Sequence, residues 1–134
     1  MIPTDRIENV SIVNVANSGI SDLTGIEAFV NLETLNVNSN NLSVIDLSNN
    51  SNLEILNAFD NELTSIDLSR NTQVERVYLG ENQLSTIDVS TNTILEVLDI
   101  HDNGIAILDL SLNVNLEELN ANNNGISSID LSNN

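Results

Sequence analysis

The strongest constraint on this chain is an internal repeat of 21 residues. The segments that start at Asn31, Asn52, Gln73, Ile94 and Asn115 align without a gap, and an earlier copy that starts at Asn9 is one residue longer. A repeat this short cannot enclose a core alone, so the copies must stack and cover one another's apolar faces. We therefore predict one repeat domain over residues 1–134, with copies at 9–30, 31–51, 52–72, 73–93, 94–114 and a truncated copy at 115–134.

Apolar residues occupy fixed places in every copy. The alternation around Leu35 and Val37 has the period of two that is typical of a strand, and stacked copies would form a parallel sheet from such strands. The Ile45-Asp46-Leu47 segment also alternates, which indicates an extended opposite side. In the copy at 31–51 the residues predicted to point inward are Leu32, Leu35, Val37, Leu42, Ile45 and Leu47. The predicted fold is a β-rich repeat solenoid with a short parallel sheet on its concave face, extended or turn segments on its convex face, and little or no α-helix.

Each copy contains L-x-x-L-x-(L/V/I/A)-x-x-N-x-(L/I), which resembles the leucine-rich repeat pattern. The 21-residue length, the D-L-S-x-N ending and the opening ISDLTGIEAFVNL are similar to secreted bacterial leucine-rich repeat proteins of the internalin-like kind. Many of those carry Cys at the third apolar position, where this chain departs from the pattern with Val37, Ala58, Leu79, Ile100 and Ala121. The resemblance implies a non-catalytic binding module, a secreted or cell-surface location, and further modules after the repeats. We therefore expect the chain to be a segment of a longer protein.

Asn recurs at two columns of the repeat. The amides of Asn40, Asn61, Asn82, Asn103 and Asn124 are predicted to bind backbone groups that the bend after each strand leaves unpaired. The D-L-S-x-N ending places oxygen-bearing side chains at alternate positions, as in half of a calcium loop. The interpretation that we prefer is that its Asp and Ser bind nearby backbone N–H groups and hold a turn.

Charge narrows the classes of partner. The chain has 20 Asp and Glu against 3 Lys and Arg, a net charge of −17, which excludes binding to nucleic acid or to anionic membrane surfaces. A basic partner or a divalent cation would be attracted instead. Residues 1–10 lack the basic and apolar regions of a signal peptide, and no apolar run is long enough to span a bilayer. The absence of Cys excludes disulfides and thiol chemistry.

The outward positions at which the copies differ are the candidates for recognition. Only 2% of residues are aromatic, yet Phe59, Tyr78 and His101 gather in three consecutive copies, with Gly80 expected to leave a hollow between Phe59 and His101. Exposed rings flanked by charge are typical anchors of protein interfaces. The predicted binding surface consists of Phe59, Tyr78 and His101 as anchors, Arg76 and Asp99 as polar selectors, and Asp60, Glu81 and Asp102 as attractors of basic groups.

Three alternatives stay open at this point. Asp60, Glu81 and Asp102 could share a calcium ion, as could the column Glu33, Glu54, Glu75, Glu96 and Glu117, although we prefer solvated acidic stripes and assign no metal ligands or cofactor. His101 and Asp99 invite an acid–base interpretation, but no nucleophile accompanies them, so we expect no enzyme. The predicted function is recognition of a protein partner, or else of a glycan. The alternative is a structural spacer of a surface adhesin that calcium could stiffen.

Overall fold

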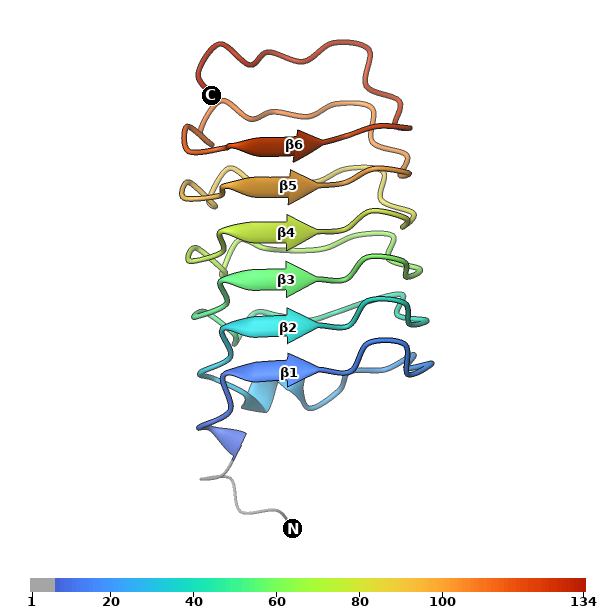
Figure 1. Cartoon of the computed structure of the whole chain (residues 1–134), viewed down its shortest axis with the longest axis vertical. Helices are drawn as coiled ribbons and strands as arrows, with labels where there is room; N and C mark the ends of the chain where they lie inside the picture. Colours follow the sequence, from blue (N-terminus) through green and yellow to red (C-terminus); the bar gives the residue numbers. More distant parts are fainter. Residues whose placement is uncertain (1–6) are drawn as a thin grey trace.

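The computed structural model describes residues 7–134, where the chain winds into a solenoid that carries one short strand in each coil (Figure 1). The strands form one parallel sheet in chain order. Six strands of three residues and one 3₁₀ helix are present in this part of the chain: β1 (Ile12–Asn14), η1 (Ile26–Ala28), β2 (Thr34–Asn36), β3 (Ile55–Asn57), β4 (Arg76–Tyr78), β5 (Val97–Asp99) and β6 (Glu118–Asn120). The structure thus confirms the β-rich solenoid with very little helix.

Equivalent residues of successive copies lie side by side in the sheet. Leu35 pairs with Leu56, which pairs with Val77, which pairs with Leu98. The first pairing joins Val13 to Leu35, because the first copy has 22 residues rather than 21. The sheet therefore keeps its register throughout, and the extra residue is accommodated outside the strands.

The core is a set of aliphatic columns between the sheet and the opposite wall. Of the residues predicted to point inward in the copy at 31–51, Ile45 is 6% exposed and Leu47 is 1%, while Leu32, Leu35, Val37 and Leu42 are fully buried. Leu56, Val77 and Leu98 continue the Leu35 column with no exposure. Fully burying one such side chain stabilises the fold by roughly 1.5–3 kcal/mol, so stacked aliphatic columns can replace large aromatic rings in holding the coils together.

The first Asn column binds the backbone as the sequence predicts. The Nδ2 group of Asn61 donates to the carbonyls of Val37 (3.0 Å), Ala58 (3.2 Å) and Phe59 (3.2 Å), and its Oδ1 accepts from the backbone N–H of Leu42 (3.0 Å). Since Val37 and Leu42 belong to the preceding coil, the amide joins two coils as well as closing its own bend. Asn82, Asn103 and Asn124 repeat these contacts.

A second Asn column lies inside the molecule, which the sequence analysis missed. Asn50, Asn71, Asn92 and Asn113 are fully buried, and the Nδ2 of Asn71 donates to the carbonyls of Leu47 (3.1 Å) and Asn50 (2.8 Å). Each of these amides satisfies two buried carbonyls of the preceding coil, which fixes its orientation. The Asn of D-L-S-x-N is therefore separated from its Asp and Ser, so the motif does not form half of a calcium loop.

The Asp and Ser of the same motif form the predicted turns. The Oδ1 of Asp88 accepts the backbone N–H of Ser90 at 2.9 Å, and the same bond recurs at Asp46, Asp67, Asp109 and Asp130. Accepting the hydroxyl and backbone hydrogens of Ser90 lowers the pKa of Asp88, because these bonds favour the charged carboxylate. The preferred interpretation of the motif as turn chemistry is confirmed for Asp, whereas the Ser hydroxyl binds the Asp carboxylate and not a backbone N–H group.

The two ends of the solenoid are less enclosed than its middle. Ile129 and Leu131 of the last coil are 39% and 48% exposed, since no further coil covers them in this structure. The predictions about a leader at residues 1–10 lie largely outside the described residues. No helix in residues 7–134 is both long and apolar enough to cross a bilayer.

Candidate functional site

The predicted binding residues lie on two regions of the same face. Arg76, Tyr78 and Asp99 belong to the strands β4 and β5, where Arg76 is flanked by Ile55 and Val97 and Tyr78 pairs with Asp99. The remaining five predicted residues follow the ends of strands β3 to β5, at the eighth and ninth positions of their copies: Phe59, Asp60, Glu81, His101 and Asp102. The sheet thus brings three consecutive copies of the predicted surface into one neighbourhood.

The ninth position of every coil has a left-handed backbone. Its φ angles lie between 51° and 54° in Asn17, Ser39, Asp60, Glu81, Asp102 and Asn123. Asn and Asp adopt this conformation more readily than other residues with a side chain, which accounts for four of the six. From the sequence this position was predicted only to face a ligand; the structure shows that its residue types also suit the bend.

The hollow predicted at Gly80 does not exist, because the His101 ring fills it. The imidazole lies over Gly80, where a Cβ atom would overlap its Cε1 and Nδ1 atoms. It stacks against Phe59 with 5.7 Å between ring centroids and 29° between ring planes. The glycine is thus a platform that lets rings from alternate coils meet. All three predicted anchors are half-buried rather than fully exposed.

In most coils the side chain at the sixth position accepts a hydrogen bond from the backbone two residues later. The Oδ1 of Asn57 accepts the backbone N–H of Phe59 at 3.2 Å, and Asp99 accepts that of His101 at 3.2 Å. Tyr78 cannot make this bond, since a phenol lacks an acceptor at that length. Asp99, predicted as a polar selector, therefore also holds the bend that carries His101.

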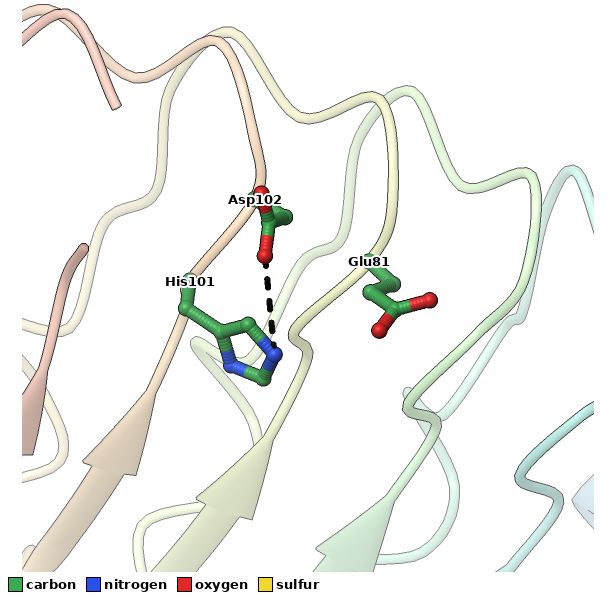
Figure 2. A group of neighbouring side chains, drawn as sticks. All are labelled: Glu81, His101 and Asp102. Carbon is green, nitrogen blue, oxygen red and sulfur yellow. Dashed lines mark ion pairs between the residues drawn. The ribbon is translucent and has the colours of Figure 1, made fainter. Parts of the chain in front are cut away.

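Asp99 also orients the His101 ring. Its Oδ1 lies 2.5 Å from Nδ1, while the Nδ2 of Asn120 donates to its Oδ2 at 3.3 Å. On the other side of the ring, Nε2 lies 3.8 Å from the Oδ2 of Asp102 (Figure 2). The pKa of His101 is raised, chiefly by the hydrogen bond to Asp99, against a smaller opposing effect of burial, and further by the charges of Asp99, Asp102 and Glu81. Asn120 is a member of this cluster that the sequence analysis did not single out.

The acidic residues do not form the stripe that a shared calcium ion would need. In residues 7–134, the only set of three His, Cys, Asp or Glu side chains with ligand atoms within 4.8 Å of one another is Glu81, His101 and Asp102. Asp60 is not part of it. The proposed sharing of one calcium ion among Asp60, Glu81 and Asp102 therefore has no geometric support.

Arg76 extends the site along the sheet. Its guanidinium lies 3.5 Å from the carboxylate of Glu96 in the next coil, with both side chains substantially exposed. An exposed pair of this kind contributes only about 0–1 kcal/mol to stability, so it holds the Arg76 side chain weakly. Val97 beside it is only 7% exposed and forms an apolar floor.

No family model matches the chain, and no curated protein matches its sequence. Solved structures do match. An internalin (inlF) of Listeria monocytogenes superposes with a TM-score of 0.91 at 28% identity, over 94% of this chain and 38% of its own. A leucine-rich repeat protein of Leptospira interrogans gives 0.82 at 25% identity, over 92% of this chain and 34% of its own. This chain therefore spans well under half the length of either.

A plant leucine-rich repeat protein has the same fold at a lower sequence identity. The leucine-rich repeat ectodomain of the Arabidopsis thaliana membrane receptor kinase GASSHO1/SCHENGEN3, solved in complex with Casparian strip integrity factor 2, gives a TM-score of 0.79 at 22% identity, over 92% of this chain and 17% of its own. The match to the internalin extends over the strands, the bends and the opposite wall, since it covers nearly the whole chain. Together with the 21-residue coil, it shows that this chain forms a leucine-rich repeat solenoid that is similar to those of bacterial internalins.

Proposed function

We propose that this chain is a non-catalytic recognition module that presents its sheet face to a protein partner at the cell surface or outside the cell. The observation that carries the proposal is the half-buried stack of Phe59 on His101, held by Asp99 and set beside Tyr78. Partly exposed rings that are already fixed lose little conformational entropy on binding, which favours affinity. The receptor ectodomain that shares this fold is solved with a bound partner, which supports a binding role for such a surface.

The negative charge of the chain narrows the chemical classes of partner that we propose. Asp60, Glu81 and Asp102 border the rings, and the whole chain carries a net charge of −17. A partner with basic groups around an aromatic or apolar centre would therefore be attracted by the carboxylates and would pack against the rings. A glycan is a second candidate, since half-buried rings beside carboxylates and amides can also stack on sugars and bind hydroxyls.

A displayed library of random peptides tests the proposal, with a glycan array run beside it. We expect binders rich in Lys, Arg and apolar residues, and we expect their binding to be lost in a Phe59→Ala, Tyr78→Ala double variant. The matched control is Ile107→Ala, which removes an apolar side chain that is 80% exposed and lies between the Asn column and the D-L-S turn. Binders that tolerate the double variant would contradict the proposed surface.

The rival proposal, a structural spacer stiffened by calcium, makes a different prediction. A spacer would select no binder from either library, and its melting temperature would rise with calcium and fall with a chelator. Equal melting temperatures in both solutions, together with selected binders that need Phe59 and Tyr78, would decide for recognition.

A further inference from the structure

One His and two carboxylates converge beyond the ends of strands β4 and β5, and no metal was expected there from the sequence. Glu81, His101 and Asp102 each offer one ligand atom, and these atoms lie within 4.8 Å of one another. Figure 2 shows the imidazole edge facing the Asp102 carboxylate, with the Glu81 carboxylate arriving from the neighbouring coil. Both carboxylates stand on the left-handed ninth position of their coils, so the repeat places them in register.

The distances suit a small divalent cation. Bonds of about 2.1 Å to imidazole nitrogen and carboxylate oxygen in a tetrahedron put the ligand atoms about 3.4 Å apart. His101 Nε2 and Asp102 Oδ2 are already 3.8 Å apart, and the Glu81 side chain is long and exposed enough to close the remaining gap. Three ligands of this kind leave a fourth position open to water or to an outside group.

A second observation, which involves neither Glu81 nor Asp102, concerns the other ring nitrogen of His101. Asp99 Oδ1 lies 2.5 Å from His101 Nδ1, so in the neutral ring Nδ1 keeps the hydrogen and Nε2 presents its lone pair to Glu81 and Asp102. Metal-ligating His residues almost always bind such an outer carboxylate or carbonyl, which fixes the ring and makes it a better ligand. The stack on Phe59 restrains the same ring from its face.

We propose that Glu81, His101 and Asp102 form a binding site for a divalent transition-metal ion, of which Zn²⁺ is the representative, with Asp99 as a positioning residue. The imidazole nitrogen distinguishes this ion from Ca²⁺ and Mg²⁺, which take oxygen ligands. The proposal is independent of the proposed partner, since it requires no second macromolecule.

Titration of the whole chain with zinc chloride alone tests the site by calorimetry. The buffer should hold about 0.15 M NaCl, which screens diffuse attraction to an acidic protein. We expect one Zn²⁺ per chain and no saturable heat from Ca²⁺ or Mg²⁺. A zinc titration whose heat does not saturate, or Ca²⁺ binding of equal strength, would show only diffuse attraction of cations to an acidic protein. Either result would overturn the proposal.

Variants locate the ion without disturbing the coil. His101→Asn and Asp102→Asn introduce the residue that other coils carry at these positions, as Asn122 and Asn123 show, and Glu81→Gln preserves the side-chain length. We expect each to weaken zinc binding by about tenfold or more, since even outer partners have effects of that size. The control is Asp60→Asn, which removes the same charge from the same left-handed position outside the cluster and should leave the affinity unchanged.

A spectroscopic readout separates ligation from a mere charge effect. The chain has one His, so its imidazole signals in an NMR spectrum belong to His101. Ligation should move these signals in step with the calorimetric saturation. Zinc binding that leaves them unmoved, or that survives His101→Asn, would refute the site.

Discussion

Gly80 is the residue on which the geometry of the ring cluster depends. Its φ angle is not in the left-handed region, so the position does not need glycine for its backbone. What it needs is the absence of a Cβ atom, because the imidazole of His101 occupies that space on its way to Phe59. A residue without chemistry of its own thus decides where two rings meet.

A double-mutant cycle measures this dependence. Gly80→Ala should displace His101 from Phe59 and lower the free energy of unfolding by about 1 kcal/mol, the typical worth of a ring pair. In a His101→Asn background the same Ala should be nearly neutral, because the ring that it would overlap is gone. Urea unfolding of the four proteins gives the coupling. Equal costs in both backgrounds would show that Gly80 serves the backbone and not the ring.

At the scale of one coil, the Asn of the bend replaces the hydrogen bonds that a helix or a longer strand would supply. Strands of three residues leave most of the backbone of a 21-residue coil outside the sheet ladder. Asn61 satisfies three carbonyls and one N–H across two coils with a single uncharged side chain. Asp would present oxygen to those carbonyls, and Ser is too short to reach all four groups.

Asn61→Ala should therefore cost about 2–4 kcal/mol, because it leaves several buried backbone groups without partners. Asn124→Ala removes four bonds of the same kind in the last coil, which is more exposed, so water can replace some of them. We expect roughly half the cost there. Chemical denaturation of both variants checks the difference, and equal costs would contradict the role given to burial.

The sequence predicted the parts of the coil that recur with the same kind of side chain in nearly every copy. The Leu35 column and the Asn61 column could be placed because a period of 21 allows only one register, and a side chain that repeats without variation must meet the same surroundings each time. The D-L-S-x-N motif was treated as one exposed unit, so the burial of Asn71 was missed. The strict alternation before it breaks at the turn, so the apolar pattern does not reveal that this recurring polar side chain points inward.

The candidate site was predicted less completely than the coil. The neighbourhood of Phe59, Tyr78 and His101 follows from register alone, and the strand pairings bear out that neighbourhood. The direction of the His101 side chain does not follow from register, because it depends on a rotamer chosen by Asp99 and by the space above Gly80. A hollow was therefore predicted where a ring lies. Whether these residues bind a partner stays a prediction.

On the scale of the molecule, the five Asp–Ser turns form one acid-sensitive wall opposite the sheet. For Asp67 and Asp88 the Ser hydroxyl lowers the pKa most, followed by the Ser backbone N–H; for Asp46, Asp109 and Asp130 the order is reversed. A carboxyl whose pKa is lower in the folded chain than in the unfolded chain stabilises the fold above its unfolded pKa. That contribution is lost as pH falls through the folded pKa.

We therefore expect the turns to weaken together as pH falls below about 4, the ordinary pKa of Asp. Asp88→Asn keeps an oxygen that accepts the Ser90 N–H but cannot titrate, so its loss of melting temperature on acidification should be smaller than that of the parent. Asp88→Ala should instead be less stable already at neutral pH. Melting curves between neutral and acidic pH test this, and parallel curves for the parent and Asp88→Asn would contradict it.

The constant register of the sheet has a consequence for how such a surface changes over generations. Phe59, Gly80 and His101 are neighbours in space because each is separated from the next by one copy. Unequal recombination between copies that share the same core pattern would delete or duplicate a whole coil without breaking the core. Loss of residues 73–93 would bring Phe59 and His101 into adjacent coils and remove the Gly80 platform between them. A single genetic event would thus change the exposed side chains of the sheet face while leaving the aliphatic core intact.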